Sequence, residues 1–339
     1  MNTDPQSYIL SEAESRLIFE QTILPTELGA LSPATHNPNT NTTTTKPPLA
    51  VLIIGQTGAG KTRTAPLLKQ TLQHLRSSPP IHFIADTYKT YHPSYASLLQ
   101  THPPLASPAT SPDARRWLLH AATVAATRRS DVLLESATRH PDDFAALAQL
   151  FHGHGYRVEV VVLAVPAALS RLGILRRYYE GLPEAGPGWG LPVRLTPRGV
   201  HDEAYKGVVE AAGFVDGDGG EGGVDQVLVL RRGNVVAYVD ECVDGVWRRG
   251  EGVVQVLRRE RERPLTETER VGARESLCRL REMDVPGLEG QLLEIEELLK
   301  PLLGDSDDGG YPPLRPLSLP TSSHDEEFDV EAGLRLGMV

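Results

Sequence analysis

The residues best suited to chemistry form a glycine loop that follows an apolar run. The stretch VLIIGQTGAGKTRTAP, residues 51–66, has the spacing G-x-x-x-x-G-K-[ST], met by Gly55, Gly60, Lys61 and Thr62. Glycine reaches the dihedral angles that turn successive backbone N–H groups inward, so such a loop can surround a phosphate chain. The lysine ammonium can then reach the β and γ phosphates, and the hydroxyl can be a ligand of Mg²⁺. The residues predicted to contact the phosphates are Gly55, Gln56, Thr57, Gly58, Ala59, Gly60, Lys61, Thr62 and Arg63.

The sequence on either side of the loop supports this prediction. Residues 49–54 (LAVLII) are typical of a buried parallel strand, and residues 67–75 have helical periodicity. A helix that begins near Gly60 would direct the positive end of its dipole at the bound anion. The alternative, a glycine-rich turn with an exposed lysine, does not explain this strand–loop–helix context.

Charged residues follow the other predicted strands. Asp86 comes directly after IHFIA, and Glu135 ends DVLLE. Arg177 lies on a helical stretch after the fourth apolar run, and Arg194 lies in the loop beyond it. Ligands of open α/β sheets bind beyond the carboxyl ends of the strands. There a carboxylate can accept the proton of an attacking hydroxyl, and arginines can neutralise the charge of a phosphoryl group in transfer.

This set predicts a kinase whose catalytic residues are Lys61, Asp86, Arg177 and Arg194. A GTPase is disfavoured because the chain has no N-K-x-D motif for reading guanine. Each residue also has a structural alternative: Asp86 could cap a helix, Glu135 could stabilise a helix start, and the arginines could be solvated. A nucleotide-binding regulatory module with little turnover therefore stays open as a second class of function.

Four apolar runs separated by helical sequence set the expected fold class. Strands are predicted near residues 49–54, 81–85, 131–135 and 157–164. This alternation predicts an α/β P-loop kinase fold, a mostly parallel sheet with helices on both faces, followed by C-terminal helices. The expected parts are an N-terminal amphipathic helical segment, a flexible polar linker, the kinase domain, C-terminal helices packed on it and a disordered acidic tail. Their respective residues are 1–31, 32–48, 49–255, 256–303 and 304–339.

Composition limits the partners and the compartment. The 339 residues carry a formal net charge of -10, which argues against nucleic-acid binding because such domains are usually basic. No apolar run approaches the length of a membrane span, and the N-terminus fits neither a signal nor a transit peptide. Two cysteines, Cys242 and Cys278, form no disulfide framework. We therefore expect a cytoplasmic protein with no membrane and no nucleic-acid partner.

Several motifs in one order resemble the zeta toxin family of P-loop kinases. They are GQTGAGKT, DTYKTYHPSY, LLESATR, AVPAALSRLGILRRYYE and VRLTPRGVHDEAY, and the resemblance runs from about Leu49 to at least Val239. Bacterial members look like kinases that use Mg·ATP to phosphorylate the 3′-hydroxyl of UDP-N-acetylglucosamine. The resemblance implies that Asp86 is the general base and that Arg177 and Arg194 bind phosphate.

The resemblance also implies an acceptor site. A substrate-binding role carries over to Glu135, and Arg139 matches the arginine of the same segment. Where the family has G-T-G after the glutamate, this chain has Ser136, Ala137 and Thr138. Ala137 lacks the hydroxyl that contacts substrate in the family, so Thr138 is the predicted replacement. This departure leaves another sugar or nucleoside open as the acceptor in place of the nucleotide sugar.

The family's bacterial systems include a small helical antitoxin that blocks the nucleotide site. The resemblance therefore implies an antitoxin-like helical partner, or a similar role for the predicted helix at Tyr8–Leu28 of this chain. Its apolar residues are Ile9, Leu17, Ile18, Ile23, Leu24 and Leu28. Two hypotheses follow: this helix packs on the kinase core, or it covers the nucleotide site and restrains activity.

Overall fold

The computed structural model describes residues 4–29, 46–76, 78–181, 195–304, 310–322, 325 and 328–337, and for residues 218–222 the backbone alone. The strands are β1 (Leu49–Ile54), β2 (Ile81–Ile84), β3 (Val132–Ser136), β4 (Arg157–Leu163), β5 (Gln226–Arg231), β6 (Val235–Val243), β7 (Val246–Trp247) and β8 (Arg315–Pro316). The α-helices are α1 (Glu12–Ile18), α2 (Lys61–Arg76), α3 (Tyr95–Thr101), α4 (Pro103–Thr127), α5 (Pro141–Gly153), α6 (Ala167–Tyr179), α7 (Arg198–Gly222), α8 (Val253–Glu262), α9 (Glu267–Glu282) and α10 (Leu288–Leu299). Other helical segments are η1 (Pro5–Tyr8), the π-helix η2 (Phe19–Leu28), η3 (Ala85–Tyr91) and η4 (Lys300–Leu302).

The strands form one sheet in the order β2-β3-β1-β4-β5-β6-β7, with β8 paired to β6. Strands β1 to β5 are parallel to their neighbours, and β6 runs antiparallel to β5. From β1 the chain goes to β2, returns through β3 and then crosses to β4 on the other side of β1. The connections thus diverge at the carboxyl end of β1, which is where an open α/β sheet leaves a crevice for a ligand. The predicted α/β fold is confirmed.

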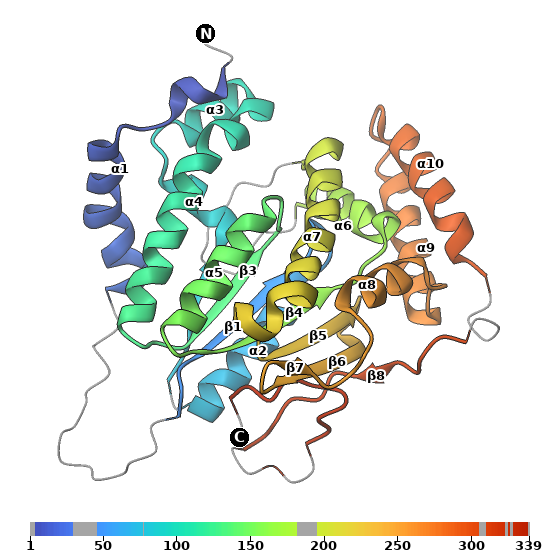
Figure 1. Ribbon diagram of the computed structural model, residues 1–339. Coiled ribbons are helices and arrows are strands. Elements are labelled where there is room, and N and C mark those ends of the chain that lie inside the picture. Colours follow the sequence, from blue (N-terminus) through green and yellow to red (C-terminus); the bar gives the residue numbers. More distant parts are fainter. Residues whose placement is uncertain are drawn as a thin grey trace.

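Helices cover both faces of this sheet (Figure 1). One face packs against α4, α5, α7 and α8, and the other packs against α2, α6, α9 and α10. All six residues of β1 are buried, because the strand has a neighbour on each side and a helical layer on each face. The apolar run that predicted this strand is therefore explained by burial on both faces.

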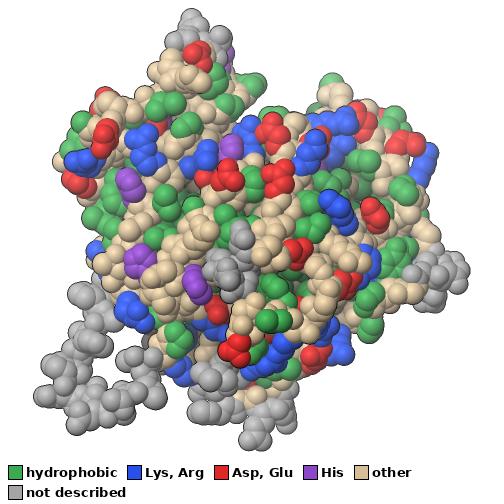
Figure 2. Space-filling model, viewed as in Figure 1, with side chains coloured by type: hydrophobic (Ala, Val, Ile, Leu, Met, Phe, Trp, Pro, Cys, Tyr) green, Lys and Arg blue, Asp and Glu red, His purple; other side chains and the backbone are tan. Residues whose placement is uncertain are grey.

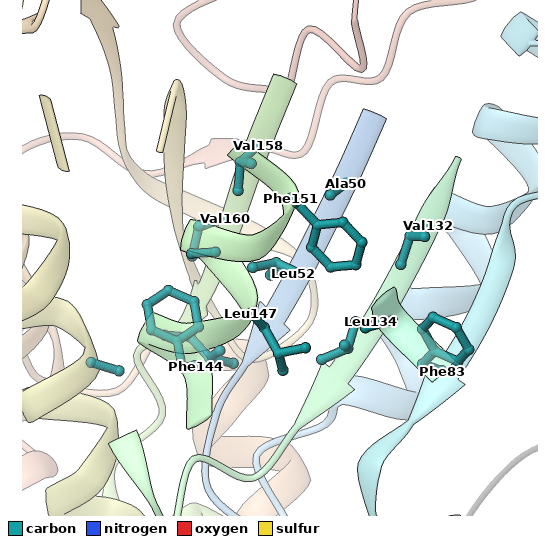
Figure 3. Packing of buried hydrophobic residues seen from close by; sticks show 14 of the residues in the cluster. Ala50, Leu52, Phe83, Val132, Leu134, Phe144, Leu147, Phe151, Val158 and Val160 are labelled. Carbon is teal, nitrogen blue, oxygen red and sulfur yellow. The ribbon is translucent and has the colours of Figure 1, made fainter. Parts of the chain in front are cut away.

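Close packing holds α5 on the first of these faces. Figure 3 shows Phe144, Leu147 and Phe151 of α5 directed at the strands, among them Leu52 of β1 and Val160 of β4. The three side chains recur at intervals of three and four residues, which places them on one side of the helix. All three are almost completely buried, so this interface fixes α5 and the β3–α5 loop before it.

The N-terminal segment is helical, as predicted, but its helix begins at Glu12 rather than at Tyr8 and presents a different apolar face. A capping box between Ser11 and Glu14 begins α1, which continues into the wider π-helix η2. Phe19, Ile23 and Leu28 are the buried residues of η2, and their intervals of four and five residues suit its wider turn. The prediction that Ile9 and Leu17 share this face is wrong, since they are 42% and 52% exposed.

This segment packs on α4 and η3. Indole Nε1 of Trp117 on α4 donates to the carbonyl of Ser15 at 3.0 Å. At the other end of the segment, the hydroxyl of Tyr91 donates to Glu27 at 2.5 Å. Of the two hypotheses for this helix, the structure agrees with the first: the helix packs on the core. Of the linker predicted at residues 32–48, only residues 46–48 lie among the described residues.

The prediction that residues 304–339 form a disordered tail is wrong for those of them that the structure describes. Strand β8 pairs with β6 through Val235 and Val236, and Leu336 is buried. The backbone N–H groups of Leu336 and Gly337 donate to the carboxylate of Glu159 on β4 at 2.9 and 3.0 Å. Glu159 is fully buried, and a buried carboxylate needs such donors. Composition pointed to disorder because it does not reveal this partner on a distant strand.

The face of the molecule in Figure 2 shows no single dominant charge. On the face in Figure 2, acidic and basic side chains are interspersed. Among the described residues, none of the helices combines the length and the apolar character that crossing a membrane requires.

The packing of the N-terminal segment can be tested with two substitutions of the same kind. Ile23 is fully buried in the core, so we expect Ile23→Ala to lower the free energy of unfolding by about 2–5 kcal/mol. Leu17→Ala, at a position 52% exposed, is the matched control and should cost less than about 0.5 kcal/mol. Urea denaturation of both variants measures the difference. Equal losses would show that the segment is not part of the folded core.

Candidate functional site

The register of the parallel strands aligns the residues predicted to form the site. Glu135 of β3 pairs with Ile53 of β1 on one side and with Ile84 of β2 on the other. Gly55 and Asp86 each lie two residues further along their chains. The start of the glycine loop, Asp86 and the β3–α5 loop therefore meet at the same edge of the sheet.

The glycine loop has the backbone that the motif predicted. Gly58 and Gly60 have φ angles of +80° and +106°, in the region that favours glycine. A Cβ on Gly58 would lie 2.0 Å from the carbonyl oxygen of Ser170, so a side chain there would also clash with α6. A Cβ on Gly60 would meet no atom within 4 Å, so this part of the loop faces open space. Helix α2 begins at Lys61, directly after the loop.

A cavity of about 170 Å³ lies over the loop, and we call it the phosphate cavity. Its lining includes Lys61, Arg63, Arg176, Arg177 and Arg232. Five cationic side chains around one small cavity suit a polyanion, so the lining fits the phosphate chain of ATP. Within the loop, Nζ of Lys61 donates to the carbonyl oxygen of Gly55 at 2.6 Å.

Arg232 is a site residue that sequence analysis missed. It follows β5, and its Nη2 donates to the carbonyls of Gly58 and Leu169 at 2.7 and 2.9 Å. Burial lowers its pKa to about 10, and the charge of Arg63 acts in the same direction. In the part of the chain that the structure describes, no carboxylate lies within salt-bridge distance of Arg232. A bound anion would therefore compensate this charge. The position of Arg232 directly after a strand is the sequence feature that could have indicated its role in the site.

Oxygen ligands suitable for Mg²⁺ line the same cavity. Thr62 contributes a hydroxyl, and Asp86 and Glu135 contribute carboxylates. Such hard oxygen donors match the preference of Mg²⁺, which binds proteins through one or two carboxylates together with substrate phosphates. Nε2 of His82 lies 2.9 Å from Oε1 of Glu135 and orients that carboxylate. The predicted metal ligand Thr62 thus lies beside two carboxylates.

Asp86 lies between the phosphate cavity and a second cavity. The second one has a volume of about 330 Å³, and we call it the acceptor cavity. Among the described residues, the two cavities share only Thr57 and Asp86 in their linings. The ammonium of Lys89 donates to Oδ1 of Asp86 at 2.5 Å across one turn of η3. Lys89 was assigned no role from sequence, although its i+3 spacing from Asp86 could have indicated this ion pair.

The acceptor cavity has a mixed apolar and polar lining. The polar side includes Arg139, whose Nε donates to Glu203 at 2.5 Å, together with Lys89 and Thr196. The apolar side comprises Leu99, Pro103, Pro104, Pro108, Ala137, Leu195, Pro197, Val200 and Ala204. Such a lining suits a small molecule with a polar group directed at Asp86 and a less polar part.

The structure brings most of the predicted residues together, but Gly55, Gln56 and Ala59 of the loop line neither cavity. Thr138 and Arg194 are further exceptions. Thr138 has a φ of +52°, and its Oγ1 is buried with no partner among the described residues. It lines neither cavity, whereas Ala137 and Arg139 line the acceptor cavity. Arg194 lies outside the described residues, whereas Arg177 lines the phosphate cavity and its Nη2 lies 3.4 Å from Oγ1 of Thr196. Among the described residues 4–29, none lines either cavity.

Gln56 ties the glycine loop to distant parts of the chain. The side chain is fully buried, and its Nε2 donates to the carbonyl of Val165 at 2.7 Å and to Ser170 at 3.2 Å. Its Oε1 accepts from Nη2 of Arg261 on α8 at 3.2 Å. The guanidinium of Arg261 stacks over the ring of Tyr205 on α7, 3.6 Å from the ring centre. The second residue of the loop is thus held from α6 and α8.

Ser170, His201 and Asp202 continue this network in the bonding order of a hydrolase triad. Nε2 of His201 lies 2.8 Å from Oγ of Ser170, and Nδ1 lies 2.9 Å from Asp202. Ser170 is fully buried, and its Oγ also lies within hydrogen-bond distance of the carbonyls of residues 166 and 167. A nucleophile must reach its substrate, so this arrangement supports the loop rather than catalysis.

Comparison with known proteins agrees with these motifs. A family model described as Zeta toxin matches residues 34–242. The chain is 30% identical over 157 residues to Toxin PezT of Streptococcus pneumoniae, an alignment that covers 46% of this chain and 59% of that protein. It is 27% identical over 159 residues to Toxin zeta of Enterococcus hirae, covering 47% and 53%. The alignments thus span little more than half the length of these relatives.

A solved structure also shares the fold. It comes from the PezAT chromosomal toxin–antitoxin system of Streptococcus pneumoniae and superposes with a TM-score of 0.59 at 19% identity. The match covers 83% of this chain and 100% of that one. At this identity the likeness supports the α/β fold and nothing about the acceptor.

The network behind the loop predicts a dependence of stability on pH. Burial lowers the pKa of His201 below its ordinary value of 6.5, against the opposing effect of Asp202. Below pH 6.5 the unfolded chain therefore takes up a proton before the folded one does, and the free energy of unfolding falls as the pH falls. We expect His201→Gln to lose less stability than the wild type between pH 7.5 and 5.5 in urea denaturation. The exposed His74→Gln is the control and should follow the wild type; identical pH profiles for all three proteins would contradict the assignment.

Proposed function

Because this chain belongs to the zeta toxin family, we propose that it is a phosphotransferase that moves the γ-phosphoryl group of ATP to a hydroxyl of a small molecule. The observation that carries the proposal is the junction of two cavities at Asp86. A cation-lined cavity over the glycine loop meets a larger, mixed cavity, and the carboxylate lies between them. A phosphoryl donor and a hydroxyl acceptor need this juxtaposition, because transfer requires both in line at one point.

In this proposal each part of the site has a separate task. The loop from Gly55 to Arg63 binds the phosphates through its backbone N–H groups, and Lys61 neutralises the transferred group. Thr62 would hold Mg²⁺, which when bound neutralises charge on the β and γ phosphates. Arg177 and Arg194 stabilise the phosphoryl group in transfer, and Asp86 accepts the proton of the acceptor hydroxyl.

Lys89 adds a requirement to the role of Asp86. Its ammonium donates to Oδ1 of Asp86 and so fixes the orientation of the carboxylate. Oδ1 is one of two carboxylate oxygens, so a hydrogen bond from an acceptor hydroxyl to the other is compatible with this ion pair. We propose that Lys89 keeps Asp86 directed at the acceptor.

The acceptor proposed first is the 3′-hydroxyl of UDP-N-acetylglucosamine, and another sugar or nucleoside is the alternative. Support comes from family membership alone, because the chain departs from the family at Ala137. Of the residues predicted to contact the acceptor, Arg139 lines the acceptor cavity and Glu135 the phosphate cavity. We assign the contacts to Arg139 and Tyr178 rather than to Thr138, whose hydroxyl is buried.

The proposal also includes a type of protein partner and a location in the cell. A helical antitoxin is a possible type of partner because a relative belongs to a toxin–antitoxin system. We also propose a cytoplasmic location, since Cys242 and Cys278 are both free thiols, as expected in a reducing compartment.

The proposal is tested by measuring ADP release with a panel of nucleotide sugars, free sugars and nucleosides. We expect one acceptor to stimulate release, and Lys61→Ala to reduce the stimulated rate by at least about 10²-fold. Lys69→Ala, on the same helix α2 but outside both cavities, is the matched control and should retain the wild-type rate. If no acceptor stimulates release while ATP still binds, the protein is a nucleotide-binding module with little turnover.

A second substitution separates chemistry from binding. Asp86→Asn retains the shape of the side chain but cannot accept a proton. We expect the dissociation constant for ATP to change little, with phosphoryl transfer lowered on the order of 10²-fold or more. Asp142→Asn, at an exposed position on α5, controls for the loss of one carboxylate. Unimpaired transfer by a folded Asp86→Asn protein would reduce Asp86 to a structural residue.

A further inference from the structure

A third cavity adjoins the phosphate cavity on the side away from the acceptor. Its volume is about 260 Å³, and we call it the α9 cavity because α9 forms its outer wall. It shares Arg63, Gly173, Arg176 and Arg232 with the phosphate cavity, whereas none of the residues that the structure describes lines both it and the acceptor cavity. The residues that α9 contributes are Thr268, Glu269, Gly272, Ala273, Glu275 and Ser276.

The order of the three cavities gives the direction of a bound nucleoside triphosphate. Transfer to an acceptor requires the γ-phosphate at the end of the phosphate cavity that holds Asp86. The α-phosphate, which carries the ribose, must then lie at the other end, where Arg63, Arg176 and Arg232 separate the phosphate cavity from the α9 cavity. We propose that the α9 cavity binds the nucleoside, that is, the base and ribose of the phosphoryl donor. This inference rests on the proposed function.

The chemistry of the lining suits a nucleoside. Arg63 and Arg176 bring planar guanidinium groups to the cavity, and such groups stack on the faces of bases. Arg176 is held in place by two hydrogen bonds of 2.9 Å to Glu180. On the opposite wall, Thr268 and Glu275 offer a hydroxyl and a carboxylate that can accept hydrogen bonds from ribose hydroxyls or a base amine.

Two glycines line the cavity, each on a different helix. Gly272 lies inside α9, where glycine costs about 1 kcal/mol relative to alanine. A Cβ at this position would meet no heavy atom within 4 Å, so packing does not require glycine here. Gly173 of α6 lies on the shared wall, where a Cβ would come within 2.7 Å of the carbonyl of Gly58 and 3.1 Å of Arg232. Gly272 therefore leaves room in the cavity, whereas Gly173 allows α6 to approach the glycine loop closely.

Helix α9 lies outside the part of the chain that the family model matches, so the proposed nucleoside site depends on residues beyond that part. The family model ends at residue 242, and α9 begins at Glu267. The nucleoside would therefore be bound between the family segment and the C-terminal helices. The C-terminal helices thus acquire a role in binding the phosphoryl donor, although the sequence motifs assign them no role.

The test is to fill the cavity from α9 and to compare two ligands. In Gly272→Leu, the new side chain enters the α9 cavity without touching the phosphate cavity. We expect the dissociation constant for ATP to rise on the order of 10-fold, while that for inorganic tripolyphosphate stays the same. Gly290→Leu on α10, where a Cβ also meets nothing within 4 Å, is the matched control and should leave both constants unchanged. Calorimetry measures both ligands, and thermal unfolding confirms that the variants are folded.

The outcomes separate this inference from the proposed function. Unchanged ATP affinity in a folded Gly272→Leu protein, or an equal loss for ATP and tripolyphosphate, overturns the α9 cavity as the nucleoside seat while leaving the kinase proposal intact. Failure of the wild type to bind either ligand overturns both. If Gly272→Leu does not fold, Glu275→Trp at a side chain 60% exposed directs a bulky group to the same cavity and should give the same result.

Discussion

The rest of the structure depends on holding five cationic side chains around one small cavity. Lys61, Arg63, Arg176, Arg177 and Arg232 all line the space over the glycine loop. Like charges this close repel, and neither salt nor distance screens them fully. The protein offsets the repulsion with local acceptors: a loop carbonyl for Lys61, Glu180 for Arg176 and two carbonyls for Arg232. The site is therefore arranged to bind a polyanion, and the surrounding acceptors offset the repulsion between its cationic side chains.

The C-terminal helices are part of these surroundings. Arg261 of α8 donates to Gln56 of the loop, and burial lowers the pKa of Arg261 to about 10. At the end of β5, the fully buried Arg231 donates to Glu269 of α9 at 2.6 Å and to the carbonyl of Glu260 at 2.6 Å. Breaking such buried contacts from one side is costly because it leaves an unpaired charge. The family-matched segment and α8–α10 therefore act as one folded unit.

The sequence predicted the strands and the residues at their ends, but not the supports behind them. Asp86 and Glu135 were predictable because apolar runs mark buried strands and parallel register aligns their ends. Helical sequence was expected between residues 85 and 131, but the bounds of α4 were not predicted, and Pro108 and Pro112 lie inside it although proline argues against a helix interior. Here burial of the alanines and Trp117 that follow on the same helix outweighs that preference. Arg261 was also missed, since its partner Gln56 lies 205 residues away and no local pattern connects them.

The contact between Glu159 and the tail has a consequence for how the chain is made. Glu159 lies in β4, next to the strand that leads into the glycine loop, and its buried carboxylate accepts from Arg157 and from N–H groups 177 and 178 residues later. A ribosome that adds about 5–20 residues per second needs roughly 9–35 s to cover that distance. Throughout this interval the carboxylate has Arg157 as a partner but lacks the two N–H donors of the tail. The centre of the sheet therefore reaches its final stability late in translation, so a nascent chain that stalls before residue 336 leaves the nucleotide-binding strand poorly supported.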